Sequence, residues 1–289
     1  MKKVKHITLS HSSLGQYHAC PRLWAWERLG GLVPVEQIDE STTAAFKGTL
    51  IHEAIDTAWT KGDWRKRIDE LLPANAFLRL IPENKSGSLK HIMTLIESYL
   101  EYYNVPNESD YELVSSEQQL ELRLTNRISI GGRVDKIFKR KSDGKLVVVD
   151  HKTSSSPANW VIPLVQSNAQ FTGYVAMAQS LKMDCSEILI DCISTAKKDI
   201  KNPFTRVTAV RTPSDIAEWK SHVVHAGNRL IEDIENGSFT NGGQKACLSF
   251  GGCTFLDVCN SPQTQRAQML KNGFKRLTDT WEIDKIEYK

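Results

Sequence analysis

The sequence predicts an α/β protein in which helices come first, a β-meander follows, and a further helix and strand complete the core. Before residue 110, apolar residues recur at helical spacing. After it, apolar and polar residues alternate as in paired strands. The predicted core elements are strands at 111–125, 127–139 and 145–152, a helix at about 163–182 and a buried strand at 188–193. This α-β-β-β-α-β order with a mixed sheet argues against a TIM barrel or a doubly wound fold, because both need repeated β–α alternation.

Composition places the chain among ordinary globular proteins. It has 289 residues, of which 40% are hydrophobic and 25% charged, and a net charge of +3. The charge is too small to indicate nucleic-acid binding by itself. No apolar run approaches the ~18 residues of a membrane span, and no apolar signal core follows the basic N-terminus. We therefore expect a cytoplasmic protein in a reducing compartment, in which the six cysteines do not form structural disulfides.

The N-terminal region is predicted to be helical. Residues 1–9 form a short flexible or strand-like arm, and a serine among residues 10–13 caps a helix that continues to Leu29. Pro21 lies inside this pattern, so the helix kinks or restarts there. After a loop at 31–43, three more helices are expected. They start at Thr42 or Thr43 and run to Trp59, from 64 to 72, and from 90 to 103.

The stretch 131–152 carries the chemistry. Asp143-Gly144 is a hairpin turn signal between two strands, one with Asp135 and the other ending in Asp150-His151-Lys152. Because side chains alternate along a strand, Asp150 and Lys152 share a face and His151 points away. Two carboxylates brought together across a hairpin repel each other unless a cation lies between them. The pattern predicts a metal-dependent hydrolytic site.

These motifs resemble the PD-(D/E)xK nuclease superfamily, whose G-x-x-D and D-x-K motifs match Asp135 and Asp150 to Lys152. The stretch 48–53, with His52, resembles the upstream histidine motif of its RecB-like branch. Gln170 to Tyr174 resembles that branch's Q-x-x-x-Y helix. The four cysteines resemble its iron–sulfur subgroup, which includes AddB-type nuclease domains and CRISPR-adaptation exonucleases. They are Cys20, Cys247, Cys253 and Cys259.

The resemblance implies a restriction-endonuclease-like core and a role for each matched residue. His52, Asp135, Asp150 and the backbone carbonyl of His151 would hold Mg²⁺ or Mn²⁺. Lys152 would orient the attacking water and offset charge on the phosphate. The alternative for Lys152 is a plain surface ion pair with Asp150.

Four further residues bear on the predicted site. Gln170 and Tyr174 share a helix face and would touch the scissile phosphate or position the metal-bound groups. Tyr174 could instead pack in the core. Neighbouring helix positions point about 100° apart, so Glu53 is expected to face away from His52. Glu117 is a candidate for a further acidic member of the site.

For the four cysteines the resemblance favours a structural [4Fe–4S] cluster that clamps the two ends of the chain. A zinc ion and free buried cysteines are the alternatives. The late cysteines are spaced evenly, C-x5-C-x5-C, whereas the common family form places two of them two residues apart. The spacing also lacks the short C-x2-4-C knuckles that are usual in zinc sites. Cys185 and Cys192 are expected to be small core residues.

The expected organisation is one nuclease domain at 1–262 and a tail at 263–289. Within the domain we expect a helical region at 1–110, a catalytic core at 111–211, and a C-terminal helix with the cysteine-rich segment at 212–262. The resemblance implies a metal-dependent DNA exonuclease acting in recombination, repair or DNA processing. An endonuclease of the same superfamily and a non-catalytic DNA- or protein-binding module are the alternatives. The chain has no G-x-x-x-x-G-K-[ST] loop, so any unwinding would come from a helicase or recombination partner. The oligomeric state stays open.

Overall fold

The structure is a computed structural model that describes residues 3–35, 43–74, 76–85, 87–155, 162–196, 203–248, 252–277 and 285–289. The chain forms two compact units. Unit 1 comprises Met1–Ile38, Glu121–Gly132 and Ala217–Lys289, and unit 2 comprises Asp39–Leu120 and Arg133–Ile216. Each unit is described by itself. The division of the chain into a domain at 1–262 and a tail stays a prediction.

Helices and strands follow one another in the order that the sequence predicts for the core. The described helices are α1 (His11–Ala19), α2 (Pro21–Trp24), α3 (Ala44–Trp59), α4 (Trp64–Leu71), α5 (Leu89–Tyr102), α6 (Ile162–Ser167), α7 (Ala169–Ser180), α8 (Pro213–Asn236), α9 (Gly243–Leu248), α10 (Leu256–Asn260) and α11 (Gln263–Gly273). The described strands are β1 (Val4–Ser10), β2 (Leu32–Pro34), β3 (Tyr111–Arg123), β4 (Ile128–Arg140), β5 (Leu146–Ser154), β6 (Cys185–Ser194), β7 (Phe204–Val210), β8 (Phe274–Arg276) and β9 (Lys285–Tyr288).

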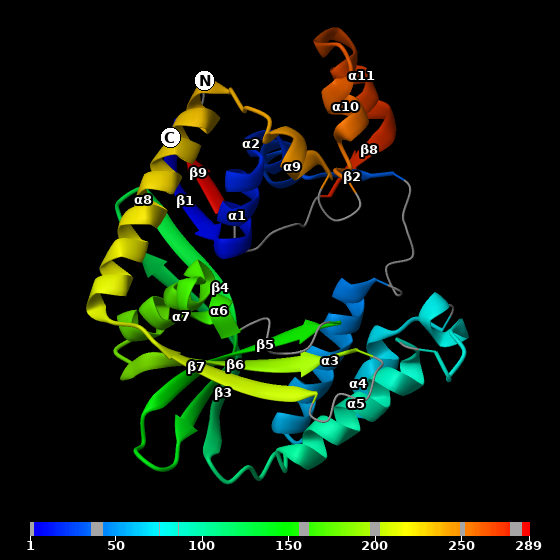
Figure 1. The fold of residues 1–289 in the computed structure, drawn as a ribbon. Helices are drawn as coiled ribbons and strands as arrows, with labels where there is room; N and C mark the ends of the chain where they lie inside the picture. The colour runs from blue at the N-terminus through cyan, green and yellow to red at the C-terminus, as the bar shows by residue number, and fades with distance from the viewer. Residues whose placement is uncertain are drawn as a thin grey trace. The chain divides into compact units, whose positions relative to one another are not determined.

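Unit 2 is built on a mixed sheet with the strand order β7-β6-β5-β4, and β3 also pairs with β4 (Figure 1). β5 runs antiparallel to β4 and parallel to β6, and β6 runs antiparallel to β7. Helices α6 and α7 cover one face of these strands, and α3 to α5 lie against the other. The mixed α/β fold expected from the sequence is confirmed.

The apolar core of unit 2 follows from the alternation along β5. Val147 and Val149 point to the face covered by α3 to α5 and belong to one buried cluster. The cluster also holds Leu50 and Ile55 of α3 and Tyr99 of α5. Every second side chain of β5 points toward α3, and the apolar residues of α3 recur at helical spacing on the side that contacts them. The strand period therefore determines which side chains of β5 face α3.

The hairpin between β4 and β5 forms where the sequence predicts it. Its connection covers 141–145, longer than a two-residue turn, and Gly144 has a φ of +74° that favours glycine. The Asp143 carboxylate accepts a hydrogen bond from the backbone N–H of Lys145. These contacts set the register that brings Asp135 near the end of β5.

Helix α3 starts as predicted, because Thr43 caps it by accepting a hydrogen bond from the N–H of Phe46. The prediction of a single helix at about 163–182 is wrong in one respect. It is divided into α6 and α7 at Asn168, whose side chain accepts a hydrogen bond from the N–H of Gln170. An asparagine side chain caps a new helix more readily than it sits in a helix interior.

In unit 1, the arm predicted at 1–9 contains the buried strand β1. It pairs in parallel with the first residues of β4 and antiparallel with β9, which lies in the segment predicted as a tail. That tail also contains α11 and β8, and β8 pairs with β2. β2 occupies part of the loop predicted at 31–43, of which residues 36–42 lie outside the described part of the chain.

The predicted interruption at Pro21 separates α1 from α2. Pro21 occupies the first turn of α2, where its missing N–H costs nothing, and Cys20 caps this helix through its sulfur. None of the described helices is long and apolar enough to cross a membrane.

Candidate active site

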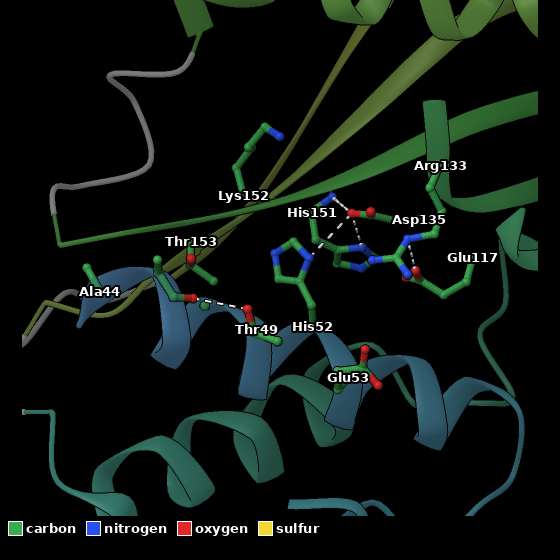
Figure 2. A pocket seen from close by; sticks show the side chains of 12 residues that line it. Ala44, Thr49, His52, Glu53, Glu117, Arg133, Asp135, His151, Lys152 and Thr153 are labelled. Carbon is green, nitrogen blue, oxygen red and sulfur yellow. Dashed lines mark hydrogen bonds and ion pairs between the residues drawn. The ribbon is translucent and has the colours of Figure 1, made fainter. Parts of the chain in front are cut away.

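Unit 2 contains a cavity of about 450 Å³ beside α3 and the ends of the central strands (Figure 2). It is lined by polar and charged side chains from α3, β3, β4 and β5. They are Thr49, His52, Glu53, Glu117, Arg133, Asp135, His151, Lys152 and Thr153, together with Ala44, Ala45 and Gly48. Gly48 allows the close approach of α3 to β5, since a Cβ there would lie 2.9 Å from Thr153 Oγ1.

His52 and Asp135 face each other in this cavity. His52 Nδ1 lies 3.6 Å from Asp135 Oδ2, and the two side chains are 29% and 19% exposed. Burial lowers the pKa of His52 to about 4, so its ring is neutral at pH 7 and a nitrogen lone pair is available. Burial alone would raise the pKa of Asp135, but hydrogen bonds from the ring and the backbone N–H of His151 hold it below its usual range. The pair therefore offers a carboxylate and a neutral imidazole.

Asp150 and Lys152 lie on the opposite face of β5 from His151, as the alternation predicts. Lys152 Nζ is 2.6 Å from Asp150 Oδ2, and the Asp150 side chain is 3% exposed. Burial raises the pKa of Asp150 to about 6, and Asp135 adds to this while Lys152 opposes it. Burial alone would lower the pKa of Lys152, but Asp150 raises it above its ordinary value. Lys152 is therefore an ammonium at pH 7.

The His151 side chain is buried, with 1% exposure, on the face that α3 and α5 cover. Its backbone N–H donates to Asp135 Oδ2 at 2.7 Å, and its Nδ1 is 3.5 Å from the same oxygen. Burial lowers the pKa of its imidazole. Both the backbone and the ring of His151 thus contact Asp135.

Gln170 and Tyr174 share a face of α7, as their spacing predicts. Gln170 Nε2 donates to the Tyr174 hydroxyl at 2.8 Å. Burial raises the pKa of Tyr174, and the charge of Asp150 raises it further. Lys152 Nζ lies 5.7 Å from the ring centre of Phe171 on the same helix. The predicted helix motif therefore belongs to the Asp150–Lys152 side of β5.

The donor chemistry of the site suits a hard divalent cation, with two carboxylates, a neutral imidazole and a backbone carbonyl available. Asp150 Oδ2 is buried and receives no hydrogen bond of normal geometry from the described residues, although Lys152 is close. In the described part of the chain, no three His, Cys, Asp or Glu side chains are grouped tightly enough to hold an ion as they stand. The types of ligand atom present fit such a cation.

Two acidic residues that line the cavity form ion pairs with arginines. Glu117, a candidate from the sequence for a further acidic residue of the site, lines the cavity. Its carboxylate pairs with Arg133 Nε at 2.7 Å. Burial raises the pKa of Glu117 to about 7. Glu53 also lines the cavity, and its carboxylate accepts from Arg67 at 2.8 Å. Arg133 was missed in the sequence, although it lies two residues before Asp135 on the same strand.

The four cysteines predicted to act together line one small cavity in unit 1. The N–H groups of Leu23 and Gly242 donate to Cys20 Sγ, and Arg22 Nη1 lies 3.7 Å from Cys259 Sγ. The space between them is about 10 Å³, room for roughly one water, so an iron–sulfur cluster would have to spread these side chains. Cys185 and Cys192 are buried in β6 as expected.

Comparison with known proteins identifies the family. The chain matches the model of the PD-(D/E)XK nuclease superfamily over residues 8–260. It belongs to this superfamily. Among curated proteins no relative matches the chain.

Two solved structures are similar to this member of the superfamily. One, from Eubacterium rectale and named as an exonuclease, has a TM-score of 0.52 and 14% identity, with 88% of each chain covered. At that identity it shows a shared fold. The other, a phage-related exonuclease from Haemophilus somnus 129PT, has a TM-score of 0.36 and 17% identity, and covers 81% of this chain and 97% of its own. That similarity is too low to support an argument.

Proposed function

We propose that this protein is a divalent-metal-dependent exonuclease that hydrolyses the phosphodiester bonds of linear or single-stranded DNA. One observation carries the proposal. Asp135, His52 and Lys152 line a single polar cavity, and Asp150 is paired with Lys152 at its edge. Carboxylates beside a neutral imidazole and a protonated lysine are the groups that metal-assisted phosphate hydrolysis requires. Membership of the PD-(D/E)XK superfamily agrees with this chemistry.

In this proposal His52, Asp135, Asp150 and the carbonyl of His151 hold Mg²⁺ or Mn²⁺. The cation would polarise the scissile phosphate and lower the pKa of the attacking water. Lys152 keeps its proton because Asp150 raises its pKa, so it acts by stabilising negative charge on the phosphate rather than as a base. The neutral His52 ring favours Mn²⁺ somewhat over Mg²⁺, since imidazole is a softer donor than water.

Gln170 and Tyr174 would position the phosphate or the residues that hold the cation. Their hydrogen bond fixes the Tyr174 hydroxyl on the side of β5 that carries Asp150 and Lys152. A tyrosine hydroxyl and a glutamine amide can both donate to a phosphate oxygen. The two residues would therefore act on the substrate from the α7 side.

A structural [4Fe–4S] cluster on Cys20, Cys247, Cys253 and Cys259 is part of the proposal, and with it membership of the RecB-like iron–sulfur branch. These cysteines come from distant parts of the sequence and line one cavity within unit 1. Joining them would close a long loop and so reduce the conformational freedom of the unfolded chain. The cluster would stabilise unit 1 without entering the hydrolytic reaction.

The exonuclease form is preferred over an endonuclease because the structurally similar protein from Eubacterium rectale is named as an exonuclease. Such an enzyme would act in recombination, repair or DNA processing, with DNA as its substrate and a helicase or recombination protein as a partner.

A cleavage assay on sequence-matched linear and circular DNA, single- and double-stranded, tests the proposal. It uses anaerobically purified protein with Mn²⁺ or Mg²⁺, and EDTA as the control. Loss of linear DNA alone, suppressed by EDTA, is expected. Cleavage of circles would support an endonuclease instead. DNA binding without cleavage in either metal would support a binding module and contradict the enzymatic assignment.

A further inference from the structure

A buried network of charged and aromatic residues lies directly behind the proposed metal site in unit 2. His151 forms its front, because its ring is 3.5 Å from Asp135 on one side and 3.8 Å from Asp191 Oδ2 on the other. The Tyr99 hydroxyl lies 3.4 Å from His151 Nε2. The side chains of His151 and Asp191 are 1% and 0% exposed. The proposed hydrolytic chemistry uses the backbone of His151 and leaves its imidazole without a role.

Asp191 is held in place from several directions. The parallel pairing of β5 with β6 sets it in register with His151. The Tyr99 hydroxyl donates to its Oδ2 at 2.6 Å, and Arg206 Nε donates to the same oxygen at 2.9 Å. Arg206 also pairs through both terminal nitrogens with the Glu108 carboxylate. A carboxylate fixed by a guanidinium and a phenol has little freedom to reorient.

The charges of this network do not balance. Asp191 and Glu108 share one guanidinium, that of Arg206, which lies 3.6 Å from the ring centre of Tyr103. No described residue donates a hydrogen bond to Asp191 Oδ1, although this atom is buried. Buried charge that is only partly compensated costs stability, so its presence next to an active-site residue calls for a functional reason. His151 is the polar group that faces both Asp191 and the site.

We propose that the His151 imidazole is a positioning residue. Backed by Asp191, Tyr99 and Arg206, it holds the Asp135 carboxylate in the orientation that binding of the divalent cation requires. Asp135 Oδ2 accepts a hydrogen bond from the His151 N–H at 2.7 Å and lies 3.5 Å from the His151 ring, and these contacts hold the carboxylate where it faces His52. In metal sites, groups that hydrogen-bond the ligands set their orientation and change metal affinity about 10- to 100-fold. The buried network of Asp191, Tyr99 and Arg206 therefore sets the affinity of the enzyme for the cation through the His151 ring. This inference rests on the proposed metal site.

The test measures Mn²⁺ affinity by isothermal titration calorimetry on the full-length protein at one pH. Asp191→Asn and His151→Gln are each expected to weaken Mn²⁺ binding about tenfold or more. The double variant should bind no more weakly than His151→Gln alone, because both changes act through one ring. Glu187→Gln is the matched control. Glu187 lies on the same strand β6 and pairs with Arg140 at 2.8 Å, away from His151, so this variant should keep wild-type affinity.

The unfolding temperature of each metal-free variant separates positioning from mere support of the fold. A structural role alone predicts that Asp191→Asn lowers stability but leaves Mn²⁺ affinity at the wild-type value, which would overturn the proposal. The proposal would also be overturned if the double variant bound Mn²⁺ more weakly than His151→Gln by the full factor seen for Asp191→Asn alone. Tyr99→Phe serves if Asp191→Asn fails to fold, and weakening of at least threefold is expected for it, whereas unchanged affinity counts against the proposal. If the wild-type protein itself binds no Mn²⁺, both the metal site and this inference are wrong.

Discussion

Lys152 Nζ lies 2.6 Å from Asp150 Oδ2, two residues away on the same face of β5. The strand period brings the two side chains together, and α7 covers them on that face. The pair keeps Lys152 protonated, and it keeps a buried carboxylate charged where burial alone would favour its neutral form. The catalytic role proposed for Lys152 depends on this ion pair with Asp150.

Replacing Asp150 with asparagine should abolish cleavage and leave DNA binding intact. The amide keeps the shape of the side chain but removes the negative charge that a cation needs. We expect a rate at least ~100-fold lower, equivalent to roughly 3 kcal/mol in the barrier. Binding of labelled single-stranded DNA, measured by fluorescence anisotropy beside the cleavage rate, checks this. Parallel loss of binding and cleavage would indicate a folding defect instead.

His52→Asn should raise the Mn²⁺ concentration needed for half-maximal activity by about tenfold or more. The reason is that the neutral His52 ring, 3.6 Å from Asp135, is a proposed ligand. The preference for Mn²⁺ over Mg²⁺ should narrow at the same time. His222→Asn is the control, since His222 is exposed on α8. An unchanged metal requirement in His52→Asn would remove this residue from the ligand set.

Tyr174→Phe should slow cleavage about tenfold, an effect of ~1.4 kcal/mol, with little change in stability. The substitution removes the hydroxyl that Gln170 contacts and keeps the packing of the ring. Single-turnover rates at saturating protein measure the chemical step directly. A wild-type rate would show that Tyr174 only packs in the core.

Cys253→Ser should lower the iron content of anaerobically purified protein and reduce its unfolding temperature by several degrees. Serine does not supply the thiolate that a cluster requires. Cys185→Ala is the matched control, because Cys185 is buried in β6 and does not line the cysteine cavity. Iron and sulfide analysis checks both variants. Wild-type protein that contains zinc, or no metal at all, would contradict the cluster.

His11 should make stability depend on pH in unit 1. Burial lowers its pKa from 6.5 to about 4, and no described residue hydrogen-bonds its Nε2. The unfolded chain therefore binds more protons than the folded chain between these values, and stability falls as pH drops from 6.5 to 4. The loss is at most ~3 kcal/mol. Urea unfolding at pH 4 and 7 should show a smaller difference for His11→Phe than for the wild type or His222→Ala.

Local signals predicted much of the fold and of the site. The alternation along β5 placed Asp150 and Lys152 together, and the helical spacing placed Gln170 beside Tyr174. Thr43 and Pro21 marked helix ends through their own backbone and capping chemistry. In each case the deciding interaction lies within a few residues, where sequence patterns carry the information.

Contacts between distant residues were not predictable in the same way. Asp191 contacts His151 only because β5 and β6 pair in parallel in one register. The apolar run around Asp191 does not indicate which residue it would contact. The single charge inside that run was the available signal. Strand β1 pairs with residues more than a hundred positions away, so its place in a sheet could not be inferred from its own pattern.

The most direct test of the central claim compares Lys152→Ala with Lys139→Ala on linear single-stranded DNA in Mn²⁺. Lys139 is exposed on β4 of the same hairpin and does not line the cavity, so it controls for general loss of positive charge. The account predicts degradation by the wild type and by Lys139→Ala, and a rate at least ~100-fold lower for Lys152→Ala. Equal degradation by both variants would contradict the assignment of this cavity as the nuclease site.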